Sequence, residues 1–233
     1  MKKVSIAIPC YEMKDKGVEF LNYSLHRIAS QTYSNIQVVI SDHSKDDKLQ
    51  NLSKFWNKKL DIKYLKNFNR NGSSSANLNY ALDNCDGDLI KILFQDDFLF
   101  HSKSIEKVVE KFSDEIKWLV TSCIHTQNGI DFYRNHTPVW NNNILFGENT
   151  ISSPSVLTIH KTVKERFDEN LLWLMDCEFY YRLFLKFDLP KILHDCSVAN
   201  RIWGGQVTND ISEILKQQEL QYVIKKFDSN KNE

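Results

Sequence analysis

The sequence predicts an α/β fold: a single domain in which helices flank a central, mostly parallel sheet. Over the first hundred residues, short β-branched segments alternate with segments whose apolar residues recur at helical spacing, a pattern that favours parallel strands covered by helices. The 233 residues suffice for one sizeable core and are marginal for two. A hydrophobic content of 42% with 26% charged residues is typical of a globular protein.

The elements of the N-terminal half follow from these patterns. The expected strands cover residues 4–8, 36–40, 62–65 and 89–94, and the expected helices cover 17–30, 49–56 and 76–85. Residues Ser73 to Ser75 are candidates to cap the third helix, because a serine hydroxyl can accept a hydrogen bond from a free N–H at a helix start.

Polar residues follow three of these strands at the points where the strands end. They are the segment Pro9 to Glu12, the segment Asp42 to Asp47, and the pair Asp96-Asp97. The carboxyl ends of parallel strands meet at one edge of a sheet, and ligands bind beyond that edge. We therefore expect the three clusters to converge on one ligand site.

The second half of the sequence is less regular. We expect strands at 118–124 and 192–198, a helix at 175–187, loops or short hairpins at 126–150, and an amphipathic helix at 211–227. The polar face of this last helix mixes Glu213, Lys216, Gln217, Glu219 and Lys225. Helices that lie on membranes are usually rich in Lys and Arg on that face. We therefore expect the helix to dock on the protein, with dimer formation or peripheral membrane contact as the alternatives.

Composition disfavours several classes of partner. Lys+Arg and Asp+Glu each number 30, so the net charge gives no indication of a nucleic-acid partner. No segment approaches the ~20 apolar residues of a transmembrane helix, and the apolar run that ends at Pro9 is too short for a signal peptide. Five widely spaced cysteines without a CxxC pair are typical of reduced thiols, so we expect a cytoplasmic protein without a zinc site.

Asp96 and Asp97 directly follow a strand that we expect to be buried. Adjacent carboxylates repel each other and lose hydration unless a cation lies beside them. A hard divalent ion, Mn²⁺ or Mg²⁺, together with a diphosphate supplies this compensation, because such an ion binds few protein carboxylates and completes its shell with phosphate oxygens and water. The alternative is a solvated turn before a helix that starts near Ser104.

Two further segments are candidates for nucleotide contacts. Asp42 ends the second strand and could accept hydrogen bonds from a base or a ribose, whereas the neighbouring Ser44 or Asp46 could simply cap the next helix. The loop with Arg70 and Asn71 precedes a helix start, and both helix N-termini and arginines favour phosphate groups. An ordinary junction between loop and helix is the alternative there.

Asp176 lies in an apolar segment, beside Trp173 and Met175. Burial of a carboxyl among such residues raises its pKa, which suits a general base. Glu178 has a simpler explanation, because Arg182 lies four residues later on the same helix and can pair with it. That pairing does not account for Asp176.

These features, in this order, resemble the inverting GT-A glycosyltransferases of the family 2 type over most of the chain. The segments that carry the resemblance are 4–12 (VSIAIPCYE, similar to V-S-I-I-I-P-x-Y-N), 42–46 (DHSKD, matching D-x-S-x-D), 72–81 (similar to a G-x-x-x-A-x-N-x-A stretch), 94–97 (FQDD, similar to the DxD-type motif), and 167–182 with its FDENL and Asp176-x-Glu178. Each motif is short, and five in order are specific.

The resemblance implies an activity and a role for each site residue. It implies transfer of a sugar from a nucleotide-sugar donor, foremost a UDP-sugar, to a hydroxyl of a glycan or lipid-linked acceptor in polysaccharide or glycoconjugate synthesis. Asp97 would bind Mn²⁺ or Mg²⁺, and Asp176 would deprotonate the acceptor hydroxyl, with inversion at the anomeric carbon. The residues implied to hold the nucleotide are Pro9, Tyr11, Glu12, Asp42, Asn71 and Asp96.

The resemblance also implies a division of the chain. Residues 1–210 would form the GT-A domain, with the nucleotide-sugar contacts in residues 1–100 and the acceptor site and the base in residues 101–210. Residues 211–233 would form the C-terminal helix and tail.

The sequence departs from the family pattern at two positions. Gln95 stands at the first position of the DxD motif, so metal binding would depend mainly on Asp97. Trp203 stands where many relatives have a histidine; it cannot bind a metal, but it could stack on a sugar or pack in the core. The alternative functions are a nucleotide-sugar hydrolase, a nucleotidyltransferase, and a non-catalytic carbohydrate-binding protein, which would not need Asp97 and Asp176 together.

Overall fold

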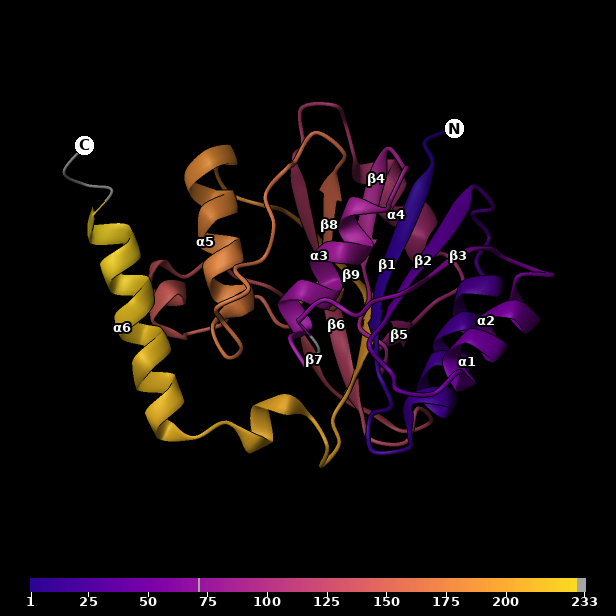
Figure 1. The fold of residues 1–233 in the computed structure, drawn as a ribbon. Helices are drawn as coiled ribbons and strands as arrows, with labels where there is room; N and C mark the ends of the chain where they lie inside the picture. Colours follow the sequence, from indigo (N-terminus) through magenta and orange to yellow (C-terminus); the bar gives the residue numbers. More distant parts are fainter. Residues whose placement is uncertain (71, 230–233) are drawn as a thin grey trace.

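Over the described residues 1–70 and 72–229, the computed structural model contains a sheet with the strand order β3-β2-β1-β4-β8-β6-β9-β5, and β7 pairs with β6 (Figure 1). The strands β1 (Val4–Cys10), β2 (Ile36–Asp42), β3 (Asp61–Lys66) and β4 (Leu89–Ile92) are parallel to their neighbours within this group. Cys10 pairs with Asp42, so β1 and β2 end at the same edge. The predicted parallel arrangement is present in this part.

The rest of the sheet is mixed. It contains β5 (Phe98–Leu99), β6 (Trp118–Thr126), β7 (Phe132–His136), β8 (Leu157–His160) and β9 (Lys191–Arg201). Strand β8 runs antiparallel between β4 and β6, whereas β6 and β9 are parallel to each other. The sequence patterns did not predict β5 and β8. A two-residue strand such as β5 is too short to show a periodicity.

Six α-helices of the described residues pack around the sheet. They are α1 (Gly17–Ala29), α2 (Lys48–Trp56), α3 (Ser74–Asp83), α4 (Ser104–Lys111), α5 (Met175–Phe187) and α6 (Glu213–Ser229). Helix α3 packs against β1 and β2, and its start is capped as predicted, because the Ser73 hydroxyl accepts a hydrogen bond from the Ala76 N–H at 3.2 Å.

The hydrophobic core extends from the parallel strands to α5. Every residue of β1 and β4 is buried, as expected for parallel strands covered on both faces. At the other end of the core, the rings of Trp118 on β6 and Tyr180 on α5 stack with 6.2 Å between their centroids. These contacts fix α5, and with it the segment that carries Asp176, on the sheet.

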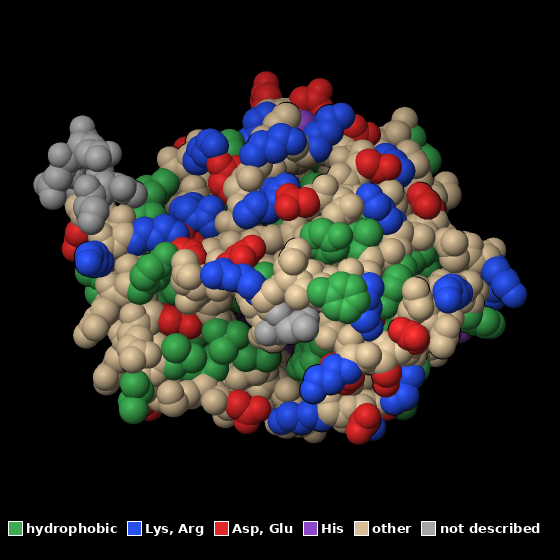
Figure 2. All heavy atoms as spheres, in the orientation of Figure 1, with side chains coloured by type: hydrophobic (Ala, Val, Ile, Leu, Met, Phe, Trp, Pro, Cys, Tyr) green, Lys and Arg blue, Asp and Glu red, His purple; other side chains and the backbone are tan. Residues whose placement is uncertain are grey.

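Helix α6 lies alongside α5, which confirms the expected docking on the protein (Figure 1). Val223 is buried, and the Phe227 ring makes an edge contact to the Tyr181 ring with 5.0 Å between centroids. Within the described residues, none of the helices is long and apolar enough to cross a membrane. Figure 2 shows basic and acidic side chains interspersed over this face of the molecule.

Candidate active site

A cavity of about 720 Å³ lies beyond the carboxyl ends of β1, β2 and β4. Small-molecule sites usually measure ~300–1,000 Å³, so the volume suits a nucleotide-sugar. The predicted site residues that line it are Pro9, Tyr11, Glu12, Asp96, Asp97 and Asp176. The structure therefore brings the donor, metal and base candidates of the sequence together. Asn71 lies outside the described residues, and Asp42 does not line the cavity.

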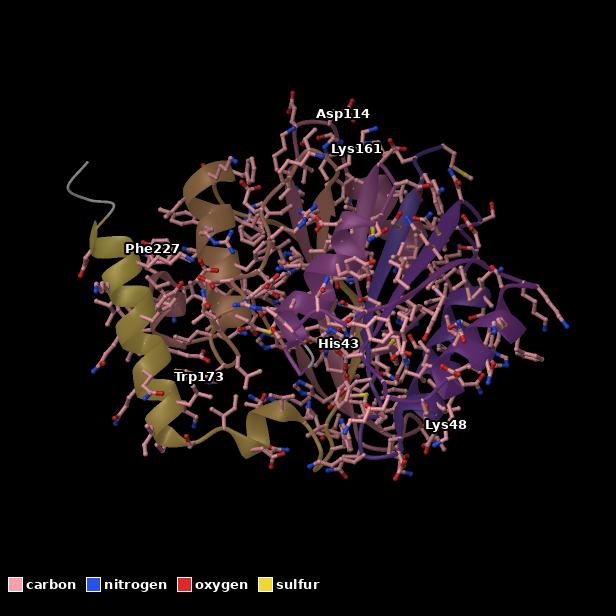
Figure 3. All side chains as sticks on the ribbon, in the orientation of Figure 1. His43, Lys48, Asp114, Lys161, Trp173 and Phe227 are labelled. Atoms are coloured by element: carbon pink, nitrogen blue, oxygen red, sulfur yellow. The ribbon has the colours of Figure 1, made fainter. Side chains whose placement is uncertain are left out.

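Two walls form most of this cavity, and the start of α3 completes it. The strand wall consists of residues that follow β1, β2 and β4, and His43 belongs to it. The α5 wall consists of the segment that leads into α5 together with residues from 152–154 and 200–208, and Trp173 belongs to it. Figure 3 shows Trp173 close to α6, and His43 beside the parallel strands.

Trp203 holds the Asp96 side chain in place. The Trp203 indole N–H donates to Asp96 Oδ2 at 2.9 Å, and the Trp203 ring packs edge-on against Phe20 with 5.2 Å between centroids. Burial raises the pKa of Asp96, while this hydrogen bond opposes the rise by stabilising the ionised form. Trp203 is thus a packed residue that orients one of the two carboxylates.

Asp97 is 4% exposed and is held by the end of β9. Its Oδ1 accepts a hydrogen bond from the Arg201 N–H at 2.9 Å, and its Oδ2 accepts one from the Asn200 side chain at 2.8 Å. Burial, and then the charge of Asp96, raise the pKa of Asp97. Two adjacent carboxylates in this environment are costly to ionise unless positive charge is supplied.

The charges of Arg201 and the buried Lys91 act on Asp96 and Asp97, respectively, but neither side chain forms an ion pair with them. No ion pair among the described residues includes Asp96 or Asp97. The Arg201 guanidinium donates to the Asp96 backbone carbonyl at 3.2 Å and lies over the Phe20 ring. A divalent cation therefore fits the pair. In the described part of the chain, no group of three or more acidic, His or Cys side chains could hold a metal, so phosphate oxygens and water would complete its shell.

Gln95, at the first position of the DxD-type motif, has a structural role. Its side-chain carbonyl accepts a hydrogen bond from the Tyr11 N–H at 2.9 Å, and its amide donates to the Gly17 carbonyl at 2.8 Å. A Cβ at Gly17 would lie 2.5 Å from the Tyr11 carbonyl oxygen, so this close approach requires glycine. Gln95 thereby ties the loop with Tyr11 and Glu12 to the loop with Asp96.

Asp42 lies beneath the strand wall, fully buried. Its Oδ1 accepts a hydrogen bond from the Ser44 N–H at 2.7 Å, and its Oδ2 accepts one from the Tyr64 hydroxyl at 2.6 Å and lies 3.5 Å from Lys66 Nζ. Asp42 therefore shapes the turn that presents His43 and Lys45 to the cavity. Its predicted contact with a nucleotide stays a prediction.

Asp176 lies in the first turn of α5 and faces the cavity. Its Oδ2 accepts a hydrogen bond from the Asn149 side chain at 2.7 Å, and its Oδ1 accepts one from the Cys177 N–H at 2.8 Å. Burial raises the pKa of Asp176 to about 6, although these hydrogen bonds favour the ionised form. The carboxylate is thus oriented, and it can accept a proton near neutral pH.

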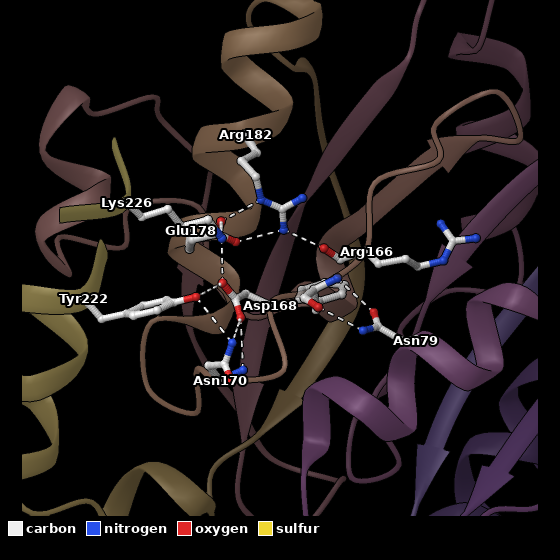
Figure 4. A network of polar contacts seen from close by, with 9 residues as sticks. Asn79, Arg166, Asp168, Asn170, Glu178, Arg182, Tyr222 and Lys226 are labelled. Carbon is white, nitrogen blue, oxygen red and sulfur yellow. Dashed lines mark hydrogen bonds and ion pairs between the residues drawn. The ribbon is translucent and has the colours of Figure 1, made fainter. Parts of the chain in front are cut away.

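Glu178 is fully buried and does not line the cavity. Arg182 donates to both of its oxygens, at 2.6 and 2.8 Å, and the Lys226 ammonium lies 2.8 Å from one of them (Figure 4). The predicted pairing of Glu178 with Arg182 is confirmed. Glu178 is therefore a structural residue, in contrast to Asp176.

Some residues of the site were not predicted. Asn149 and Asn200 orient Asp176 and Asp97 through their side chains. Asn149 belongs to an Asn-rich segment for which the sequence predicts only loops or short hairpins. The sequence pattern therefore gave no reason to select Asn149 rather than a neighbouring asparagine as a site residue. Asn200 belongs to the end of β9, and its position beside Asp97 depends on the pairing of β9 with β6. A prediction of the strand order would have been needed to find it.

Comparison with known proteins supports the same interpretation. The family model described as "Glycosyl transferase family 2" matches residues 5–193. An uncharacterized glycosyltransferase of Rickettsia typhi is 22% identical over 236 residues, which cover 93% of this chain and 69% of that protein. An uncharacterized glycosyltransferase of Rickettsia felis is 32% identical over 102 residues, which cover 43% of this chain and 16% of that protein.

Solved structures with the same fold include S. aureus TarS and a mannosyltransferase from Pyrobaculum calidifontis. TarS 1–349 in complex with UDP-GlcNAc superposes with a TM-score of 0.70 at 18% identity, over 95% of this chain and 71% of that chain. This chain covers 43% of a longer TarS chain. PcManGT from Pyrobaculum calidifontis, in complex with GDP-Man and Mn²⁺, has a TM-score of 0.62 at 15% identity, over 87% of this chain and 58% of that one. The protein belongs to glycosyltransferase family 2 and has the GT-A fold.

Proposed function

We propose that this protein transfers a sugar from a nucleotide-sugar, foremost a UDP-sugar, to a hydroxyl of a glycan or lipid-linked acceptor, with inversion at the anomeric carbon. One observation carries the proposal. Asp176, whose pKa burial raises to about 6, lines the same cavity as the carboxylate pair Asp96-Asp97. A proton acceptor thus lies opposite a site that favours a cation and a diphosphate.

In this proposal, the nucleotide-sugar donor binds against the strand wall. Pro9, Tyr11 and Glu12 line this wall, and Glu12 Oε1 accepts a hydrogen bond from the Lys45 N–H at 2.5 Å, which joins the loops after β1 and β2. The start of α3 also lines the cavity, and free N–H groups at a helix start favour phosphate oxygens. TarS was solved with UDP-GlcNAc and PcManGT with GDP-Man, so relatives with this fold accept different nucleotides.

Asp97, with Asp96 beside it, would hold the Mn²⁺ or Mg²⁺. When bound, the ion stabilises the negative charge that develops on the departing diphosphate. The protein orients the two carboxylates through the Trp203 indole N–H, the Asn200 amide and the Arg201 backbone N–H. This orientation precedes the reaction, so little reorganisation is needed when the charge develops.

Asp176 would act on the acceptor. In this proposal, the acceptor oxygen attacks the anomeric carbon, the bond from that carbon to the diphosphate oxygen breaks, and the hydroxyl proton moves to Asp176. A single displacement of this kind inverts the anomeric configuration and needs no covalent sugar–enzyme intermediate. General base assistance typically contributes about 100- to 10,000-fold to the rate.

The test is a screen of UDP- and GDP-sugars by thermal shift with and without Mn²⁺, because a ligand that binds only the folded state raises the melting temperature. The sugar that stabilises the protein is then incubated with a panel of glycan and lipid-linked acceptors, and the products are identified by mass spectrometry. We expect a glycosylated acceptor. Release of free sugar alone would instead favour a nucleotide-sugar hydrolase, and transfer of the nucleotide would favour a nucleotidyltransferase.

A further inference from the structure

Glu219 on the C-terminal helix α6 binds the segment that leads into α5. Its carboxylate accepts three backbone hydrogen bonds: Oε1 from the Leu172 N–H at 2.8 Å, and Oε2 from the Trp173 N–H at 2.9 Å and the Leu174 N–H at 2.8 Å. The Glu219 side chain is buried, with 4% exposure for the residue. These bonds join positions separated by 45 to 47 residues in the sequence.

A helix start explains why a carboxylate binds there. The first N–H groups of a helix have no partner within the helix, and the helix dipole favours negative charge at that end. Leu174 is the N-cap residue of α5 and provides no side-chain cap. Glu219 satisfies N–H groups at and just before this cap from another helix, with charge-assisted hydrogen bonds.

The segment held by Glu219 is part of the cavity. Leu172, Trp173, Met175 and Asp176 all line it. On the side of α3, the Ser75 hydroxyl donates to the Leu171 carbonyl at 3.1 Å, so the segment is fixed between α3 and α6. Asp176 lies only two residues after Leu174, whose N–H is the last one that Glu219 binds.

Helix α6 is itself held in a defined position along α5. Lys226 Nζ lies 2.5 Å from Asp168 and 2.8 Å from Glu178, and the Tyr222 hydroxyl donates to Asp168 at 2.9 Å (Figure 4). Val223 packs into the core between these polar contacts. The network fixes α6 so that Glu219, one turn before Tyr222, faces the segment before α5.

We propose that Glu219 is a positioning residue: through the backbone of residues 172–174 it holds Asp176 at the position from which the acceptor hydroxyl is deprotonated. This inference rests on the proposed function. A displacement of about 1 Å in a reacting group can cost roughly a hundredfold in rate. Glu219 does not line the cavity, so its removal is expected to spare the binding of the donor.

The experiment compares Glu219→Ala and the isosteric Glu219→Gln with Glu213→Ala, a control on the same helix whose side chain is 80% exposed and pairs only with Lys216 among the contacts described. For each protein, the turnover, the affinity for UDP and the hydrogen exchange of the amides 172–174 are measured. We expect Glu219→Ala to lower turnover roughly ten- to a hundredfold, to leave UDP affinity within about twofold, and to accelerate exchange at 172–174. Glu219→Gln, which keeps an acceptor oxygen, is expected to restore part of the turnover. Glu213→Ala should resemble the wild type.

Wild-type turnover in both Glu219 variants would overturn the inference, as would unchanged exchange at 172–174. An equal loss of turnover and UDP affinity would do the same, because it would indicate a general structural defect. If Glu219→Ala does not fold, Glu219→Gln decides between these results. If the wild-type protein transfers no sugar, the proposed function fails, and the exchange measurement still reports whether Glu219 holds the segment.

Discussion

The two walls of the cavity are held in place by different kinds of contact. On the strand wall, backbone pairing sets the frame of the site, because Cys10 and Asp42 pair in register at the ends of β1 and β2. The Gln95 side chain adds a tie between the neighbouring loops. On the α5 wall, side chains from distant segments position the site, because Asn149 binds Asp176 and Glu219 binds the segment before α5.

This difference has consequences for function. A backbone ladder contains many hydrogen bonds and tolerates the loss of one, whereas a segment held by a few side chains depends on each of them. We therefore expect substitutions on the strand wall to change donor affinity, and substitutions on the α5 wall to change turnover.

The largest effect is expected at Asp97, where the two walls meet. Asp97→Asn, or chelation of divalent ions with EDTA, is expected to lower turnover by roughly a thousandfold, because a bound metal contributes several kcal/mol to stabilisation of the leaving group. The measurement is turnover at increasing Mn²⁺ concentrations for the wild type and the variant.

Full turnover in excess EDTA would contradict this prediction. It would mean that the Asp96-Asp97 pair has a structural role. Trp203→Phe serves as a second variant, because it keeps an aromatic ring beside Phe20 and removes the hydrogen bond to Asp96.

The next effect concerns the strand wall. Asp42→Ala is expected to weaken the binding of the nucleotide by roughly 1–3 kcal/mol, because it removes the hydrogen bonds that hold the turn with His43 and Lys45 at the cavity, with a smaller change in turnover at saturating donor. Calorimetry with UDP measures it. Tyr64→Phe is the matched control, because it removes one internal partner of Asp42 and leaves the carboxylate in place. Unchanged affinity in Asp42→Ala would show that the turn at Ser44 does not contribute to nucleotide binding.

The same contrast explains how much of the molecule the sequence could predict. The parallel strands and the residues at their ends could be found, because local periodicity and strand-end motifs determine them. Glu219 could not be assigned a role, because its contacts with 172–174 depend on how α6 docks. Trp203 is an intermediate case: the sequence placed it at a site position, but its hydrogen bond to Asp96 depends on the course of the chain after β9.

The smallest effect is expected where α6 docks. Although burial opposes its ionisation, the hydrogen bonds from Lys226, the Asn170 N–H and Tyr222 lower the pKa of Asp168 to about 2. Because this pKa is below its unfolded value, the stabilisation is present above pH ~4 and is lost as the pH falls toward about 2. Lys226→Met is expected to lower the free energy of unfolding by about 1–2 kcal/mol at pH 7. The effect stays small because Glu178 retains its ion pair with Arg182 in the variant.

Urea denaturation at several pH values measures this effect. The difference between the wild type and Lys226→Met should decrease as the pH approaches 2. A difference that is independent of pH would indicate that Lys226 stabilises α6 by packing rather than through Asp168.

The pH dependence of turnover also follows from the α5 wall. A base must be deprotonated to act, and burial raises the pKa of Asp176 to about 6. With Mn²⁺ saturating, so that Asp97 stays ionised, the value of kcat/KM for the wild type is therefore expected to fall about tenfold per pH unit below about 6. This acid limb should be absent from the residual activity of a variant that lacks the carboxylate.

The most direct test of the account is Asp176→Asn, with donor affinity by calorimetry and turnover measured on the same preparation. The substitution keeps the shape of the side chain and removes its basicity. We expect an unchanged affinity for the donor and a turnover lower by about a hundredfold or more, the usual scale of general base catalysis. A parallel loss of affinity and turnover, or no loss of either, would contradict the assignment of Asp176 as the base.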